Sequence, residues 1–100
     1  MHAVVGIWTA AESQREEQDR GLREQILPLV KAFPGFVAGY WMRDQETGKG
    51  YTTIVLDSAE SARRFKALVV GNARAQAEVG ITNDVLATVR VLAHEHADAT

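Results

Sequence analysis

The sequence contains no cysteine among its 100 residues. Disulfide bonds, thiolate catalysis and cysteine-based zinc sites are therefore excluded, and the composition fits a reducing cytoplasm, where we expect the protein to reside. No apolar run approaches the roughly 20 residues of a membrane-spanning helix, and no signal peptide is recognisable. We therefore expect no membrane partner.

An excess of charge of one sign is also missing. The chain has 11 basic and 13 acidic residues and a net charge of −2, which gives no argument for a nucleic-acid partner. Hydrophobic residues make up 46% and charged residues 24%, ordinary values for a globular domain. A chain of this length forms one domain with a modest core.

Two strand-forming runs flank a polar linker in the middle of the chain. Residues 36–43 and 51–57 are rich in β-branched and aromatic residues, and the linker holds Gly48 and Gly50. A glycine there supplies the positive φ of a turn with a bulge. Pro34 ends the preceding element, because proline donates no backbone hydrogen bond. The pattern predicts a β-hairpin.

The remaining segments predict two strands and two helices. They are a strand at 2–9, a helix at 13–33, a helix from Ser58 to an interruption at Gly71, a continuation or short third helix at 73–79, and a strand at 85–92. Ser13 begins a capping-box pattern, and Pro28 predicts a kink. Gly6 indicates a close approach or a bulge. We place Asn83 and Asp84 in a turn.

The order β-α-β-β-α-β predicts a ferredoxin-like α+β fold. Right-handed crossovers put both helices on one face of a four-stranded antiparallel sheet. We expect this domain to cover residues 1–93, followed by a polar tail at 94–100. Alternate residues of each strand are apolar on both faces, so the uncovered face would exceed the apolar patch that a monomer usually exposes. A two-fold homodimer through the sheet faces is therefore expected; the alternative is a monomer whose second face is only partly apolar.

A family resemblance rests on the corner before the hairpin. The first helix ends in Leu-Pro-Leu-Val-x-x-Phe, Pro34-Gly35-Phe36 follows directly, the third strand runs into Leu56-Asp57-Ser58-Ala59-Glu60-Ser61-Ala62, and valines alternate in the last strand. Over residues 1–93 this resembles the antibiotic-biosynthesis-monooxygenase type of dimeric α/β-barrel domain. The resemblance implies a homodimer with a pocket in each subunit, between sheet and helices. Some members oxidise polycyclic aromatic substrates without metal or flavin, others bind and break haem, and many have no established activity.

The sequence departs from the catalytic members of that family. They carry a Glu-x-Trp pattern at the end of the third strand, where this chain has Ile54-Val55-Leu56. Haem-degrading members use an asparagine in the first strand and a histidine on the second helix, and this chain has neither. We therefore expect no cofactor and no metal. Cofactor-free oxidation stays open, without one of its usual pocket groups.

Four side chains on strands are the candidate site residues. Trp8 and Trp41 are candidates for ligand binding, because an indole stacks on a flat molecule; the alternative is that they fill the core or the dimer interface. Tyr40 and Arg90 are candidates for catalysis. A tyrosine can orient a phenolic substrate, and an arginine can stabilise an enolate or peroxy anion. The alternatives are a hydroxyl at the sheet edge and an interface ion pair of Arg90 with Asp57 or Glu60.

Two function classes follow. The first is a homodimer that binds a small hydrophobic or aromatic molecule, with cofactor-independent monooxygenation as its catalytic form. The second is a non-catalytic dimeric binding or interaction module. The histidines add little: His2 precedes the first strand, and His94 and His96 on the polar tail give only two possible metal ligands.

Overall fold

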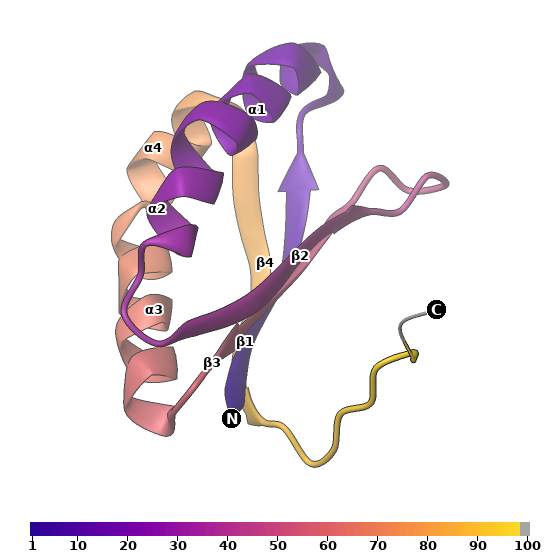
Figure 1. Ribbon diagram of the computed structural model, residues 1–100. Helices are drawn as coiled ribbons and strands as arrows, with labels where there is room; N and C mark the ends of the chain where they lie inside the picture. Colours follow the sequence, from indigo (N-terminus) through magenta and orange to yellow (C-terminus); the bar gives the residue numbers. More distant parts are fainter. Residues whose placement is uncertain (99–100) are drawn as a thin grey trace.

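The computed structural model of the chain describes residues 1–98 (Figure 1). Its elements are β1 (His2–Ala10), the 3₁₀ turn η1 (Glu12–Gln14), α1 (Arg15–Gly21), the π-helical turn η2 (Leu22–Ile26), α2 (Leu27–Lys31), β2 (Phe36–Arg43), β3 (Gly50–Leu56), α3 (Ala59–Gly71), α4 (Ala73–Glu78) and β4 (Ile81–Arg90). No helix within residues 1–98 combines the length and apolarity needed to cross a bilayer.

The four strands form one sheet in the order β2-β3-β1-β4, and every neighbouring pair is antiparallel. All four labelled helices lie on one side of this sheet (Figure 1). This is the predicted ferredoxin-like α+β fold, which is confirmed.

The hairpin and the cap of α3 also form as predicted. Gly48 has a φ of +76° in the linker, and the Asp44 amide donates to the Lys49 carbonyl at 2.8 Å. The Ser58 hydroxyl accepts a hydrogen bond from the Ser61 amide at 3.1 Å, which satisfies one of the free donors at the start of α3.

The start of the first helix differs from the prediction. Ser13 lies inside η1, and neither η1 nor α1 has a side-chain cap, so the capping-box prediction was wrong. Backbone hydrogen bonds hold the start of the helix instead. The Ala11 amide donates to the Gly80 carbonyl at 2.8 Å, and the Gln14 amide donates to the Ala11 carbonyl at 3.1 Å. The chain therefore enters the helix through a turn tied to the start of β4.

The disruption expected at Pro28 takes the form of the π-helical turn η2. Proline has no N–H for the carbonyl of Glu24, four residues earlier. Just before it, the Leu27 amide donates to the carbonyl of Leu22, five residues back. α1, η2 and α2 thus form one helical segment at 15–31 whose hydrogen-bond pattern widens in the middle.

The last strand begins earlier than predicted, because Asn83 and Asp84 lie within β4 rather than in a turn. Ile7 pairs with Val85 and Trp8 with Asn83, so Asp84 is the additional residue of a β-bulge. The Thr9 hydroxyl donates to Asp84 at 2.6 Å, which holds the bulge in place. This side-chain bond to a neighbouring strand is a tertiary contact.

The core lies mainly between the sheet and α3, and α2 adds Val30 at 4% exposure. Val4, Ile54 and Leu56 contribute from the sheet, and Ala62 and Phe65 from α3, all at most 4% exposed. Phe33 packs edge-to-face on Phe65, with ring centroids 5.2 Å apart. This cluster fixes α3 against the sheet.

The sheet face opposite the helices, here called the open face, is apolar and uncovered. Large apolar side chains on it are exposed, among them Tyr40 (59%), Met42, Val85 and Val89. After β4, residues 91–98 run without regular secondary structure on the side of the sheet away from the helices (Figure 1). The predicted tail at 94–100 extends to Ala99 and Thr100, which lie outside the described residues.

Candidate functional site

A hollow of about 560 Å³ lies between the sheet and the helices. Its lining comes from β1, β2 and β3, from the segment 15–31, and from α3 and α4, and most of it is apolar. The volume falls within the roughly 300–1,000 Å³ of small-molecule sites. We call it the apolar hollow.

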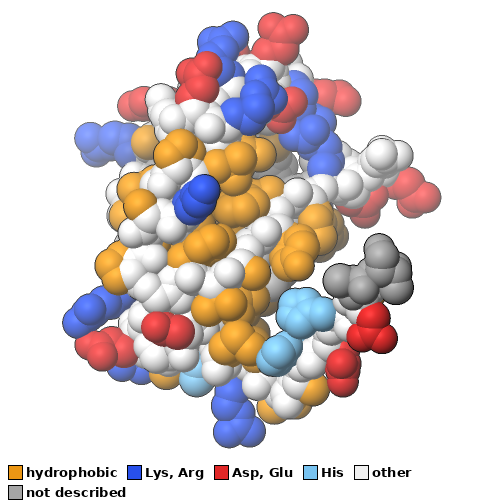
Figure 2. Space-filling view, in the orientation of Figure 1, with side chains coloured by type: hydrophobic (Ala, Val, Ile, Leu, Met, Phe, Trp, Pro, Cys, Tyr) orange, Lys and Arg blue, Asp and Glu red, His pale blue; other side chains and the backbone are white. Residues whose placement is uncertain are grey.

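The hollow exists because the two helical layers approach the sheet differently. The backbones of α3 and α4 come close to β1, β3 and β4, whereas the segment 15–31 has few such approaches. Leu22 and Leu29 of that segment line the hollow, and Ile26 lines it while also packing against the core cluster. Leu29 is 45% exposed, so the hollow is open to solvent. In Figure 2, hydrophobic side chains gather across the middle of the face in view, while charged ones cluster around α1.

Two tryptophans on the sheet line the hollow, and each lies over a glycine. A Cβ on Gly6 would stand 2.6 Å from Nε1 of Trp8, and one on Gly39 would stand 2.9 Å from Cη2 of Trp41. The close approach expected at Gly6 is therefore made by the Trp8 ring. Glycine is needed at both positions because any other residue would displace the indole.

The strand register explains how the two rings are arranged. Trp41 pairs with Thr52, and Thr52 pairs with Gly6. The Trp8 ring folds back over Gly6 and so reaches Thr52, whose hydroxyl accepts a hydrogen bond from Nε1 at 3.1 Å. Thr52 therefore lies between the two tryptophans at the base of the hollow.

Sequence reasoning named both tryptophans but missed their shared pattern. Gly6-Ile7-Trp8 and Gly39-Tyr40-Trp41 are two copies of Gly-x-Trp. In a strand the two outer residues share a face, so the pattern places an indole beside a position without a side chain. This signal was available in the sequence.

Gln18 of α1 is a buried polar residue that also lines the hollow, at 7% exposure. Its Nε2 donates to the carbonyls of Ala11 and Val79, each at 2.9 Å. Two carbonyl acceptors fix the orientation of the amide, because a reversed amide would place oxygen against oxygen. Its Oε1 has no partner among residues 1–98. Gln18 thereby links α1 to the segment just after β1 and to the segment just before β4.

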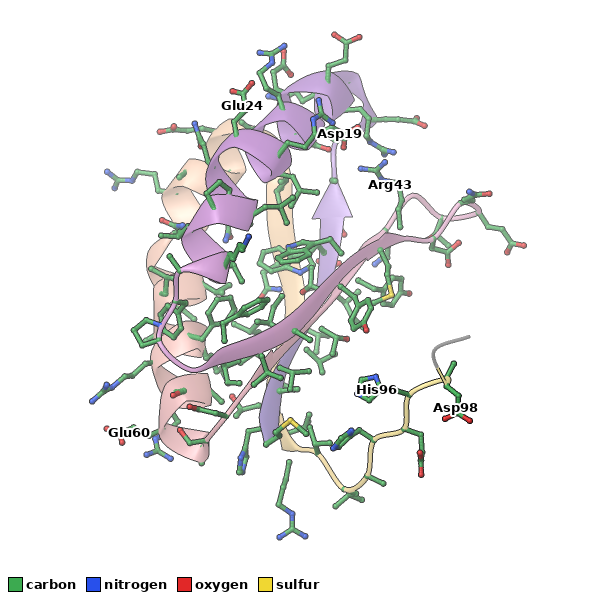
Figure 3. The ribbon with its side chains drawn as sticks, viewed as in Figure 1. Asp19, Glu24, Arg43, Glu60, His96 and Asp98 are labelled. Atoms are coloured by element: carbon green, nitrogen blue, oxygen red, sulfur yellow. The ribbon has the colours of Figure 1, made fainter. Side chains whose placement is uncertain are left out.

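An ion pair spans the rim of the hollow. Asp19 of α1 and Arg43 at the end of β2 both line it, and Figure 3 shows their side chains pointing toward one another. Nη2 of Arg43 lies 3.0 Å from Oδ1 of Asp19. The side chains are 42% and 37% exposed, so the pair adds little to stability. The pair does connect the segment 15–31, which lies away from the sheet, to the hairpin.

A second, polar hollow of about 530 Å³ lies beside the first, between η1 and the hairpin linker. Arg15, Arg43 and Asp44 are among its lining residues. The backbone amides of Glu46 and Thr47 donate to Asp44 and lower the pKa of its carboxyl. This carboxylate is thereby engaged in shaping the linker.

The structure separates the four candidate residues into two groups. Trp8 and Trp41 lie together at the apolar hollow, where their role in binding stays a prediction. Tyr40 lies on the open face, and Arg90 lies at the far end of β4, paired in register with His2. Neither lines the hollow, so catalysis by them inside it has no geometric support. The two-residue period of β2 directs Tyr40 away from the hollow, and Arg90 is too far along β4. The sequence alone did not assign either residue to a face of the sheet.

Within residues 1–98, Arg90 makes no ion pair with Asp57 or Glu60 of its own chain, and such a pair across a dimer interface stays a prediction. Glu60 pairs with Arg64 on α3 at 2.7 Å. His94 and His96 lie with ring centroids 5.5 Å apart on the segment after β4. Within residues 1–98, no three or more histidine, cysteine or acidic side chains gather as a metal site would require.

Haem, which the family resemblance implies for some members, does not fit the lining residues. The part of the hollow that the structure describes contains no histidine, cysteine or tyrosine. Together with methionine, these are the side chains that bind haem iron. Met42 is among the lining residues, but it pairs with Tyr51 in the register and its side chain is exposed on the open face. The hollow therefore offers haem iron no histidine, cysteine or tyrosine ligand from the described residues.

Comparison with known proteins gives a likeness of structure and none of sequence. No family model and no curated protein matches the chain. Its structure resembles a Deinococcus radiodurans protein classed with the antibiotic biosynthesis monooxygenases, with 16% identity, a TM-score of 0.70, and 100% and 99% of the two chains covered. It also resembles the haem degrader MhuD of Mycobacterium tuberculosis, solved with two haems in its active site, with 13% identity, a TM-score of 0.73, and 96% and 100% covered.

A third similar structure is the monooxygenase ActVA-Orf6 of Streptomyces coelicolor in complex with nanaomycin D. It shares 12% identity at a TM-score of 0.64, with 95% of this chain and 92% of that chain covered. At these identities the likeness shows the fold alone. The chain has the ferredoxin-like fold of the antibiotic-biosynthesis-monooxygenase structures.

Proposed function

We propose that this chain, which shares the fold of the antibiotic-biosynthesis-monooxygenase structures, forms a homodimer and binds a small hydrophobic or aromatic molecule in the apolar hollow. The observation that carries the proposal is the hollow itself, about 560 Å³, with Trp8 and Trp41 at its base. A domain of 100 residues has a modest core, so leaving such a volume open sacrifices apolar burial that would stabilise the fold. A ligand recovers that burial when it binds.

Binding is tested with the uncharged fluorescent probe N-phenyl-1-naphthylamine and a variant that fills the hollow. Leu22 lines the hollow, whereas Leu27 on the same helical segment does not. Leu22→Trp should abolish the blue-shifted fluorescence of bound probe, and Leu27→Trp should leave it unchanged. Equal binding by both variants would show that the probe binds elsewhere and would contradict the proposal.

The homodimer is supported by the open face. Apolar side chains on it, including Tyr40, Val85 and Val89, are 41% to 59% exposed, and a self-complementary patch favours a two-fold contact. Sedimentation velocity should give twice the 11.0 kDa of one chain. Val89→Lys should yield monomers, while Val70→Lys on the outer side of α3 should not; a monomeric wild type contradicts this part of the proposal.

Cofactor-independent monooxygenation is the second candidate, favoured by the shared fold with two proteins named as monooxygenases. In that reaction an anthrone CH₂ becomes C=O: one oxygen atom of O₂ enters the ring, the other leaves as water, and the substrate supplies all electrons. Oxygen uptake with dithranol, compared between wild type and Leu22→Trp, tests it. Uptake that exceeds the spontaneous rate only in the wild type would support catalysis. Binding of N-phenyl-1-naphthylamine without uptake would favour a non-catalytic binding module.

A further inference from the structure

The two tryptophans of the apolar hollow differ in what their N–H groups do. Nε1 of Trp8 donates to the Thr52 hydroxyl at 3.1 Å. Nε1 of Trp41 donates to no acceptor among residues 1–98, and it is not one of the fully buried unpaired atoms, so part of its surface stays accessible. An indole N–H in a largely apolar setting usually finds a partner.

The packing around Trp41 explains why the protein supplies no acceptor. The six-membered ring lies over Gly39, with Cη2 2.9 Å and Cζ3 3.0 Å from the place of a Cβ, and Ile54 Cδ1 stands 3.1 Å from that same point. The ring is thereby held against the floor of the hollow. Thr52, the residue opposite Trp41 in the register, is hydrogen-bonded to Trp8.

We propose that Trp41 Nε1–H is the specificity-determining donor of the hollow and binds a neutral carbonyl oxygen on a flat aromatic ligand. This rests on the proposed function, since it presupposes that the hollow takes such a ligand. The apolar lining and Trp8 then provide contact area, and the N–H of Trp41 selects among molecules of the same shape. An aryl ketone or quinone has the required combination of a planar ring and an acceptor in its plane.

The charges at the hollow favour a neutral acceptor over an anionic one. Of the charged side chains that line it, Glu17 and Asp19 are acidic and Arg43 is basic. Arg43 is already paired with Asp19 at 3.0 Å, so no unpaired cation of the lining faces an anion. A carboxylate or phenolate would meet a net negative rim, whereas a carbonyl carries no such cost.

The test compares two naphthalenes of similar size, 2-acetonaphthone with a carbonyl and 2-ethylnaphthalene without one. Their dissociation constants are measured by equilibrium dialysis on the wild type, Trp41→Phe and the control Trp8→Phe. Because a neutral hydrogen bond is worth a modest net gain, the preference for the ketone should fall about 3- to 10-fold in Trp41→Phe. In Trp8→Phe it should stay within about twofold, since that N–H already bonds to Thr52.

A spectroscopic readout separates hydrogen bonding from packing. The carbonyl stretch of bound 2-acetonaphthone should lie at lower frequency in the wild type than in Trp41→Phe, because a donated hydrogen bond weakens the C=O bond. If Trp41→Phe does not fold, β-(3-benzothienyl)alanine at position 41 replaces only the N–H by sulfur and serves the same comparison. An unchanged preference with an unchanged stretch overturns the role of Trp41. Failure of both naphthalenes to bind the wild type overturns the binding function on which it rests.

Discussion

The helices on one face of the sheet form two units, α3 with α4 and the segment 15–31, and these two layers are built differently. α3 buries Ala62 and Phe65 at 0% and 3% exposure and packs tightly on the strands below it. The segment 15–31 fully buries only Val30 among its apolar residues. Leu22, Ile26 and Leu29 of the same segment line the apolar hollow. One layer thus completes the core, and the other leaves room for a ligand.

The side chains at each contact account for this difference. Small Ala62 on α3 allows the helix backbone to come close to β1 and β3. Under the segment 15–31 the sheet presents two indoles, and Gln18 and the Asp19–Arg43 pair connect that segment only at its end and rim. Close packing is therefore a property of the α3 half, where side-chain volume matches the space.

The largest expected difference comes from the same substitution in the two halves. Leu56, 0% exposed, lies in the closed core, whereas Leu29, 45% exposed, lines the hollow. Leu56→Ala should lower the free energy of unfolding by about 2–5 kcal/mol, because it leaves a cavity. Leu29→Ala should lower it by less than about 1 kcal/mol. Urea denaturation measures both, and equal losses would mean that the two layers are packed alike.

Two glycines give the next comparison. Gly6→Ala would place a Cβ 2.6 Å from Trp8 Nε1 and 2.8 Å from Thr52 Oγ1, so it should cost about 1–3 kcal/mol and disturb the indole hydrogen bond. Gly21 in the helical segment has nothing within 4 Å of a Cβ, and Gly21→Ala should gain up to about 1 kcal/mol. Thermal unfolding measures whether each substitution lowers or raises the stability of the fold. A neutral Gly6→Ala would show that the Trp8 ring is free to move.

The ion pair at the rim should affect ligand exchange more than stability. Asp19→Asn should change the free energy of unfolding by less than about 1 kcal/mol but speed release of the uncharged N-phenyl-1-naphthylamine up to about fivefold in stopped-flow experiments. Glu60→Gln breaks the Glu60–Arg64 pair on the outer side of α3, away from the hollow, and is the control. Identical release rates in both variants would assign the rim pair no part in closing the hollow.

The smallest expected effect is a pH dependence in the hairpin linker. The amides of Glu46 and Thr47 lower the pKa of Asp44 in the folded protein. A carboxyl whose pKa is lower folded than unfolded stabilises the fold above its unfolded value of 3.8 and loses this contribution as the pH falls through the folded value. Urea midpoints should therefore drop below that pH, and less so in Asp44→Asn. An identical acid response in the variant would contradict this assignment.

Local patterns were enough to predict most elements of the fold. Runs rich in β-branched and aromatic residues gave the strands, Gly48 the hairpin turn, and Ser58 the start of α3, because each acts on residues within a few positions of itself. The errors fall where distant segments meet. Thr9 fixes Asp84 in a bulge from a neighbouring strand, and Gly80 anchors the entry to the first helix, so neither Asn83–Asp84 nor Ser13 adopts its local preference.

The candidate site divides in the same way. Composition and spacing provided Trp8 and Trp41 and an apolar pattern on both sides of each strand. Which face a residue occupies depends on register and on where the crossover helices lie, and this placed Tyr40 on the open face, whereas Arg90 is separated from the hollow by its position at the far end of β4. The hollow itself arises because the segment 15–31 stands away from the sheet over two indoles. That separation is set by side-chain volumes summed across several elements, which no single stretch of sequence contains.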